Sequence, residues 1–229
     1  IAINIQEGDE VVGVRLTNGH NELVLANRNG RAVRFDENAV RAMGRVSTGV
    51  RGMRLDGGDD EVVGMVVVNK PDEETIMVVS ENGYGKRSLV EDYRVTNRGG
   101  KGVKTLGITE KTGRLVAIKV VTDENDLMII NKSGIVIRLS VKECRVMGRA
   151  TQGVRLINLT KKNDVIASVC KVMSSELEAV VEDESRKQMV ATNERINQDS
   201  TSAPATQFED GDHIEESDSV ADNNDVNNE

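Results

Sequence analysis

Short runs of apolar, β-favouring residues recur along the chain, and glycine-containing turns separate them. The first pair of runs, residues 22–28 and 31–35, surrounds the dipeptide Asn29-Gly30. An Asn-Gly dipeptide between two apolar runs is the strongest short-range signal for a β-hairpin. Similar pairs of runs surround Asn82-Gly83 and Ser133-Gly134. The pattern therefore predicts three β-hairpins at regular spacing.

Each hairpin is followed by a polar connection and two further apolar runs. In the first unit the connection is 36–48, the third run is 49–55 and the fourth run is 61–69. The sequence thus predicts four strands per unit, with the later units starting at residues 74 and 125. A sheet of four short strands cannot bury its apolar face alone. We expect neighbouring units to cover one another.

The units are internal repeats. Residues 34–51 recur at 87–104 and at 138–155, with offsets of 53 and then 51 residues. Repetition with this period and strand-like flanks is typical of propeller-type blades. A sandwich of short strands is not expected to have the same residues at equivalent positions of each repeat. Four basic and two glycine columns survive in all three copies: Arg34/Arg87/Arg138, Arg41/Arg94/Arg145, Arg45/Arg98/Arg149, Arg51/Lys104/Arg155, Gly30/Gly83/Gly134 and Gly49/Gly102/Gly153.

These repeats divide the chain into predicted parts. A partial, all-β body spans 1–173, with three repeats at 22–73, 74–124 and 125–173. The segment 1–21 matches the end of a repeat, because Glu7-Gly8-Asp9-Glu10-Val11-Val12-Gly13 resembles Gly58-Asp59-Asp60-Glu61-Val62-Val63-Gly64. With neither an initiator Met nor a signal-peptide pattern at its start, the chain is expected to be part of a longer protein.

Charge separates the body from the last part of the chain. The formal net charge is −8, yet residues 174–229 hold 16 acidic and 3 basic residues, a charge of −13. The rest of the chain therefore carries +5. Residues 176–196 have a weak helical pattern, and 197–229 have too few apolar residues to form a core, which predicts disorder. A basic body with an acidic tail suggests nucleic-acid contact by the body.

Residues for catalysis or metal binding are not assembled by any motif. Cys144 and Cys170 are isolated, and His20 and His213 lie far from both in the sequence. No Ser/His/Asp, Cys/His or metal-ligand spacing results, and we expect no catalytic residue, metal or cofactor in this chain. The glycine-rich segment 83–87 lacks the spacing of a phosphate-binding loop and fits a hairpin turn. No apolar run reaches membrane-spanning length.

The basic columns carry the functional hypothesis. Phosphate binding needs cations spaced along a surface and no base-reading side chains, so repeated Arg residues suit duplex DNA. The alternative is that they only keep sheet edges and the surface soluble. The glycine columns are expected to satisfy a backbone demand such as positive φ. The candidate DNA-binding residues are Arg34, Arg41, Arg45, Arg51, Lys86, Arg87, Arg94, Arg98, Lys101, Lys104, Arg138, Arg145, Arg149 and Arg155.

Three segments carry a family resemblance. Residues 40–52 (VRAMGRVSTGVRG), 81–87 (ENGYGKR) and 146–154 (VMGRATQGV) closely resemble the C-terminal domain of the A subunit of bacterial DNA gyrase, which is a type IIA topoisomerase. The resemblance covers residues 1–173. It implies a β-pinwheel, a six-bladed propeller-like ring whose basic outer rim wraps double-stranded DNA. This chain would hold about the last half of that ring.

The resemblance also implies partners and a setting. The domain would act with the remainder of the gyrase A chain and with the gyrase B chain in an A2B2 complex in the bacterial cytoplasm, and ATP and Mg²⁺ would belong to that holoenzyme only. The family's signature box, Q-R-R-G-G-K-G, belongs to its first blade, whereas this chain has the related segment Asn97-Arg98-Gly99-Gly100-Lys101-Gly102. The alternatives are the C-terminal domain of the A chain of topoisomerase IV and a propeller-like protein-interaction scaffold.

Overall fold

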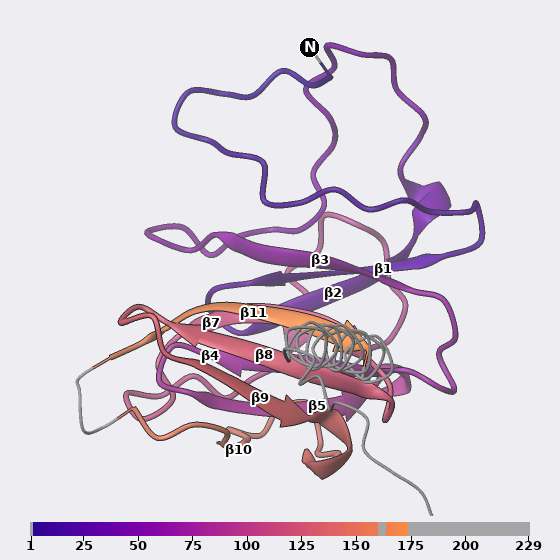
Figure 1. Cartoon of the computed structure of the whole chain (residues 1–229). Helices are drawn as coiled ribbons and strands as arrows, with labels where there is room; N and C mark the ends of the chain where they lie inside the picture. The colour runs from indigo at the N-terminus through magenta and orange to yellow at the C-terminus, as the bar shows by residue number, and fades with distance from the viewer. Residues whose placement is uncertain (1, 160–163, 174–229) are drawn as a thin grey trace, which may run out of the picture. The chain divides into compact units, whose positions relative to one another are not determined.

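The computed structural model describes residues 2–159 and 164–173, which belong to one compact unit, residues 1–180. Its strands form three antiparallel sheets, shown as arrows in Figure 1. The first sheet has the order β3-β1-β2-β6 and the second β7-β4-β5-β10. The third sheet has three strands in the described residues, β11-β8-β9. The expected all-β architecture is confirmed.

The predicted hairpins form the centre of each sheet. In the first sheet, β1 (Glu22–Asn27) pairs with β2 (Arg31–Asp36) on one side and with β3 (Val62–Val68) on the other. The Asn29-Gly30 turn places Gly30 at φ +74°, in the left-handed region that glycine adopts without cost. These strand ends lie within one residue of the prediction. The hairpins and their turns could therefore be predicted from local pattern alone.

The other two sheets repeat this arrangement. In the second sheet, β4 (Thr75–Ser80) lies between β5 (Tyr84–Leu89) and β7 (Leu115–Val121). In the third sheet, β8 (Asn125–Asn131) lies between β9 (Val136–Ser140) and β11 (Ile166–Met173). A single turn of 3-10 helix follows each second hairpin strand: Glu37–Ala39, Val90–Asp92 and Val141–Glu143.

The prediction that each repeat forms its own four-stranded sheet is wrong. The short strand β6 (Val103–Lys104) comes from the second repeat but pairs with β2 of the first sheet, through Arg31↔Lys104. In the same way β10 (Val154–Arg155) of the third repeat pairs with β5, through Arg155↔Tyr84. Each repeat thus donates its third strand to the sheet of the preceding repeat. Residues 49–55, the equivalent segment of the first repeat, form no strand.

The two junctions between sheets use the same backbone hydrogen bonds. Thr105 and Leu106 donate their N–H groups to the Gly30 carbonyl, at 2.8 and 3.2 Å. The equivalent residues Leu156 and Ile157 donate to the Gly83 carbonyl, at 2.8 and 3.3 Å. The repeat in the sequence therefore encodes a repeated junction, and strand exchange ties each unit to its neighbour.

Alternation along the strands fills a core on each side of the second sheet. In β4, Ile76 and Val78 face the core shared with the first sheet, whereas Met77 and Val79 face the core shared with the third sheet. All four side chains are buried, as is every residue of β4. This two-sided burial confirms that the units cover one another, as expected for sheets with two apolar faces.

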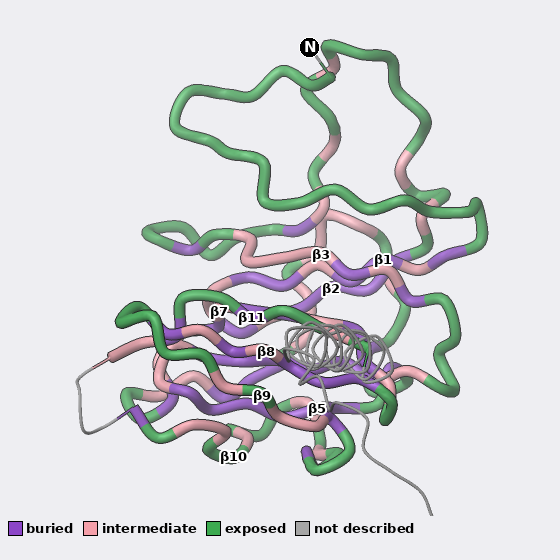
Figure 2. The backbone as a smooth tube through the Cα atoms, in the orientation of Figure 1, coloured by how far each residue is buried: buried purple, intermediate pink, exposed green. Residues whose placement is uncertain are grey.

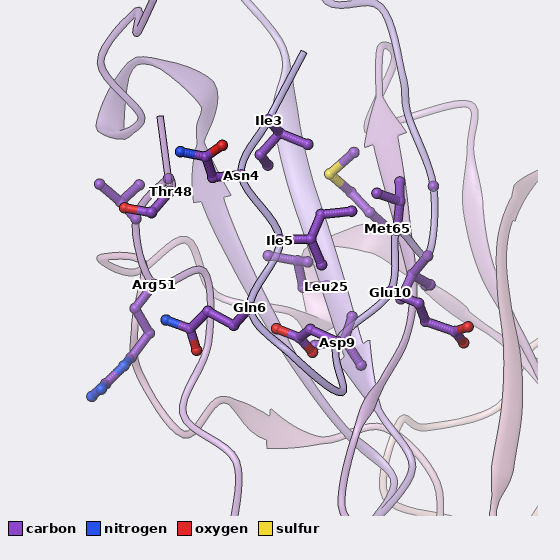
Figure 3. A pocket seen from close by; sticks show the side chains of 17 residues that line it. Ile3, Asn4, Ile5, Gln6, Asp9, Glu10, Leu25, Thr48, Arg51 and Met65 are labelled. Atoms are coloured by element: carbon purple, nitrogen blue, oxygen red, sulfur yellow. The ribbon is translucent and has the colours of Figure 1, made fainter. Parts of the chain in front are cut away.

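The outer face of the first sheet is covered differently. Leu23, Val33 and Phe35 form a smaller core there with Met53. Residues 2–16 run past this face without forming a strand and are exposed over their whole length (Figure 2). Ile3 and Ile5 of this segment face Leu25 and Met65 across a hollow of about 640 Å³, which Figure 3 shows from close by. The sequence match of this segment to the end of a repeat thus corresponds to no strand.

The predictions for residues 174–229, including the helical pattern at 176–196 and the disorder after it, lie outside the described residues.

Candidate nucleic-acid interface

The first basic column is largely internal. Arg34 and Arg87 are each 8% exposed. Arg34 donates from Nη1 to the carbonyl oxygens of Val90 and Tyr93, at 2.8 and 3.0 Å, and forms an ion pair with Glu22. These contacts run from β2 to the loop of the following repeat, so the guanidinium joins two repeats.

Arg87 repeats this arrangement one junction further on. It donates from Nε to the Cys144 carbonyl at 2.6 Å and forms an ion pair with Asp123. Because these two guanidinium groups are buried and already paired with backbone carbonyls and carboxylates, we remove Arg34 and Arg87 from the candidate DNA-binding set. Arg138, the third member, is exposed and contacts Asp126 from Nε at 2.5 Å.

In the third basic column, Arg98 and Arg149 are half-buried, because each packs against the preceding repeat. Arg98 donates to the carbonyl oxygens of Ala39 at 2.9 Å and Arg51 at 3.1 Å. Arg149 donates to the Lys104 carbonyl at 3.0 Å, which is the equivalent bond at the next junction. Arg45, the first member, is exposed. These arginines fix the exchanged segments and still present part of each guanidinium to solvent.

The second and fourth columns are the exposed ones. Arg94 and Arg145 lie just after the 3-10 turns, and Lys104 and Arg155 lie on the exchanged strands β6 and β10. Since β6 and β10 occupy the same edge of successive sheets, their basic side chains recur at one edge from sheet to sheet. Arg41 and Arg51 are exposed in the first repeat, where the Arg51 guanidinium points away from the hollow of Figure 3. We call these six residues the rim cations.

The loop 97–102, related to the family's box, is held against the preceding repeat. Gly99 donates to the Gly52 carbonyl at 2.6 Å, and the Gly100 carbonyl accepts from the Arg54 N–H at 2.8 Å. Lys101 lies 2.6 Å from the Asp56 carboxylate. That contact, together with Arg31 and Arg54, holds the pKa of the Asp56 carboxyl below its usual range. Lys101 and Arg94 line a hollow of about 330 Å³ beside this loop.

The glycine column at 49, 102 and 153 has the expected backbone. The three φ angles are +79°, +73° and +76°. At two of these positions the exchanged strand also approaches the neighbouring sheet closely. A Cβ at Gly102 would lie 2.3 Å from the Ala32 carbonyl oxygen, and one at Gly153 would lie 2.5 Å from that of Gly85. The positive φ expected for this column is thus present at all three positions, and the close approach is present at Gly102 and Gly153.

Lys86 is placed in the interior. It is 1% exposed, and its ammonium donates to Ser88 Oγ and to the Gly148 carbonyl, both at 2.9 Å. Burial lowers the pKa of Lys86 to about 8. It is therefore removed from the set of side chains that can meet DNA directly.

Sequence reasoning missed two exposed cations beside the rim cations, Lys111 and Arg54. Lys111 lies 5.3 Å from the centroid of the Tyr84 ring, and Arg155 lies 5.5 Å from it and donates to its hydroxyl from Nη2 at 2.9 Å. Arg54 is exposed next to the loop 97–102. Neither residue is basic in all three copies, because Gly58 stands at the position equivalent to Lys111 in the first repeat, and Gly107 stands at the position equivalent to Arg54 in the second. A search for repeated columns could not have found them.

In the part of the chain that the structure describes, no group of three or more His, Cys, Asp or Glu residues could hold a metal ion. Cys144 is buried, which raises the pKa of its thiol, and Cys170 is exposed. None of the helices among the described residues has the length and apolar character needed to cross a bilayer.

Stacked antiparallel sheets that exchange a strand, with cations recurring at one edge, define a propeller-like repeat domain. The family model described as "DNA gyrase C-terminal domain, beta-propeller" matches residues 1–18, 21–69, 74–122 and 125–170. The chain belongs to this family. The resemblance noted in the sequence is thereby confirmed, and the fold class with it.

Individual relatives agree with the family assignment. The DNA gyrase A protein of Staphylococcus aureus (strain NCTC 8325 / PS 47) is 46% identical over 184 residues, which cover 80% of this chain and 20% of the relative. The chain thus spans about one fifth of the length of that relative.

Solved structures give the same picture. The C-terminal domain of DNA topoisomerase IV matches with a TM-score of 0.71 at 28% identity, over 80% of this chain and 57% of that one. The DNA gyrase A C-terminal domain matches with a TM-score of 0.69 at 25% identity, over 75% and 57%.

Proposed function

We propose that this chain is the DNA-binding and DNA-wrapping part of a DNA gyrase A protein, and that it supports ATP-dependent negative supercoiling by the complete enzyme. The observation that carries the proposal is the recurrence of an exposed basic side chain at the same edge of successive sheets, Lys104 on β6 and Arg155 on β10. A curved row of phosphate contacts binds and bends a duplex without reading its sequence.

The wrapping function belongs to a larger assembly. The gyrase A protein is proposed to act with the gyrase B protein in an A2B2 complex in the bacterial cytoplasm. ATP and Mg²⁺ are proposed to bind elsewhere in that complex. The contribution of this chain is to hold DNA on its rim, and no residue described in it is assigned to DNA cleavage.

A salt titration on duplex DNA tests the binding. If the body engages about six phosphates, the logarithm of the association constant should fall against log salt with a slope of about −5. The double variant Arg94→Ala/Arg145→Ala should reduce that slope by about two contacts. A flat salt response of the unmodified chain would contradict the proposal.

The matched control removes the same charge away from the rim. Lys70 is exposed in the connection between β3 and β4, and Lys171 is exposed on β11, the edge of the third sheet opposite β9. The double variant Lys70→Ala/Lys171→Ala should leave the salt slope close to that of the unmodified chain. Equal losses in both double variants would mean that net charge, and not the rim, determines binding.

The structural likeness to topoisomerase IV supports a second candidate function for this chain, as the C-terminal domain of the A chain of a topoisomerase IV. Reconstitution of the complete enzyme distinguishes the two, because only gyrase is expected to introduce negative supercoils into relaxed plasmid with ATP. A protein-interaction scaffold, the third possibility, is expected to show no salt-dependent DNA binding.

A further inference from the structure

The second repeat contains a buried polar cluster that the proposed function does not use. Lys86 Nζ donates to Ser88 Oγ at 2.9 Å, and Ser88 Oγ donates to the Met147 carbonyl at 2.7 Å. Beside them the hydroxyls of Tyr93 and Thr105 lie 2.6 Å apart. Ser88, Tyr93 and Thr105 are fully buried, and Lys86 nearly so. We call these four residues the buried polar cluster.

The repeats provide an internal comparison for these positions. In the other two copies the four positions hold apolar residues, glycine or cysteine: Val33, Phe35, Val40 and Gly52 in the first, and Ile137, Leu139, Cys144 and Leu156 in the third. The valines and Phe35 pack in the core on the outer face of the first sheet, and the third-repeat residues pack in the core between the second and third sheets. The fold is therefore built without polar groups at these positions.

A buried ammonium is costly where an apolar residue would serve. Both hydrogen-bond acceptors of the Lys86 ammonium are neutral oxygens, so no carboxylate compensates it directly. Its charged surroundings come from two elements. Asp92 of the 3-10 turn favours the charged form of Lys86, and Arg149 of the third repeat opposes it. The neighbouring Tyr93 has a phenol whose pKa is raised by burial. Positions that break a local pattern in this way are often functional.

The cluster is also attached to the rim. Met147 and Gly148, whose carbonyls accept from Ser88 and Lys86, lie between the rim cation Arg145 and Arg149. Arg149 in turn donates to the carbonyl of the rim cation Lys104, the residue before Thr105. Lys86 thus holds the backbone that carries Arg145 and Arg149, and Arg149 connects that backbone to the carbonyl of Lys104.

We propose that Lys86 is a positioning residue that holds the loop 145–149 against the second sheet and couples its own protonation to DNA binding on the rim. The proposal rests on the proposed function. A phosphate at Arg149 neutralises the positive charge that opposes the ammonium of Lys86. The charged Lys86 in turn keeps Gly148, and with it Arg145 and Arg149, in place for the phosphates.

The direction of the coupling follows from the burial of the amine. In the free protein the pKa of Lys86 is about 8, and bound phosphate raises it. DNA affinity is therefore complete below pH 8, falls as the pH rises through 8, and levels off above the pKa of the complex. A pKa rise of about one unit corresponds to an affinity loss of about tenfold across this range.

The test measures duplex DNA affinity of the full chain from pH 6.5 to 9.5 at constant ionic strength by fluorescence anisotropy. The unmodified chain should lose about tenfold in affinity, whereas Lys86→Met should show a flat profile. Calorimetric titration at pH 8 in two buffers of different ionisation enthalpy should show uptake of a fraction of a proton, and Lys86→Met should abolish it. Lys104→Met is the matched control, because its side chain is exposed: affinity should fall at every pH with the profile unchanged.

A second measurement tests the positioning without DNA. Amide hydrogen exchange of residues 147–151 should be faster in Lys86→Met than in the unmodified chain at one pH. Lys86→Val, which copies Val33, replaces Lys86→Met if that variant does not fold. A sloping pH profile in the Lys86 variant, or unchanged exchange of the loop, would overturn the proposal. Absence of DNA binding by the unmodified chain would instead overturn the proposed function, and the exchange measurement would still decide the positioning role.

Discussion

Gly49 and Gly102 occupy equivalent positions in their repeats, with φ angles of +79° and +73°, yet their surroundings differ. A Cβ at Gly102 would lie 2.3 Å from the Ala32 carbonyl oxygen and 2.6 Å from its carbon. A Cβ at Gly49 would meet nothing within 4 Å. Alanine at either position should experience the same left-handed backbone, and only Gly102→Ala should add a collision with the neighbouring strand.

The two costs can be separated in magnitude. The left-handed conformation should cost about 1–2 kcal/mol for alanine at either position. At Gly102 the colliding atoms belong to the backbone of β2, so relief requires β6 to move away and to lose its pairing with Arg31 and Ala32. We expect a further loss of about 2–3 kcal/mol for Gly102→Ala, within the range of strained or overpacked sites.

Urea unfolding followed by circular dichroism measures this difference, and each kcal/mol should also lower Tm by about 2–4 °C. Gly153→Ala serves as an independent copy of Gly102→Ala, because the Gly85 carbonyl oxygen would lie 2.5 Å from its Cβ. Equal destabilisation by Gly49→Ala and Gly102→Ala would refute the reasoning, since it would mean that the exchanged strand does not approach β2 closely.

Three further outcomes are expected. Arg34→Met and Arg87→Met should each lower the free energy of unfolding by about 2–3 kcal/mol, because each removes charged hydrogen bonds from a buried guanidinium to backbone carbonyls of the following repeat. Arg94→Met should change it by less than about 0.5 kcal/mol. Equal urea midpoints for the three variants would show that the first column is not structural. The stability of the unmodified chain relative to Lys86→Met should rise by about 3 kcal/mol between pH 8 and 10.5. The reason is that the pKa of Lys86 is about 8 in the folded chain and 10.5 in the unfolded chain, so the unfolded chain binds more protons between these two values. Parallel pH dependences of the two free energies of unfolding would contradict this. A chain ending at Met173, which lacks the acidic segment 174–229, should bind DNA more tightly than the full chain at low salt, and this gain should shrink as salt rises. Identical DNA affinities of the two chains at low salt would mean that the acidic segment does not compete with DNA for the basic residues.

Local features of the fold could be predicted from the sequence. The glycine-containing turns, the apolar runs on either side and the repeat period predicted the three hairpins, the first of them to within about a residue. The glycine column at 102 and 153 gave the positive φ angles, because only glycine adopts them without strain. The family resemblance is also carried by the sequence, in segments such as residues 81–87.

The candidate site could be predicted only in part. Arg94, Arg145, Lys104 and Arg155 are exposed as the hypothesis requires, but Arg34 and Arg87 have the same sequence signature and are buried. A repeated arginine looks the same in the sequence whether its guanidinium meets a phosphate, water or a backbone carbonyl. Which of these it meets depends on where the loop of the next repeat lies.

Sequence by itself determined the hairpin strands, their turns and the repeat, because each depends on residues that are near one another along the chain. The tertiary structure alone decided that β6 and β10 complete the sheets of preceding repeats, with partners such as Arg31 about 70 residues away from Lys104. The pattern of side chains along a strand determines which face of the sheet is buried. It does not determine which strand pairs with an edge, because that pairing uses backbone N–H and carbonyl groups that nearly all residue types share. That choice was made by the packing of whole sheets against one another, and it also decided which basic residues became internal and which formed the rim.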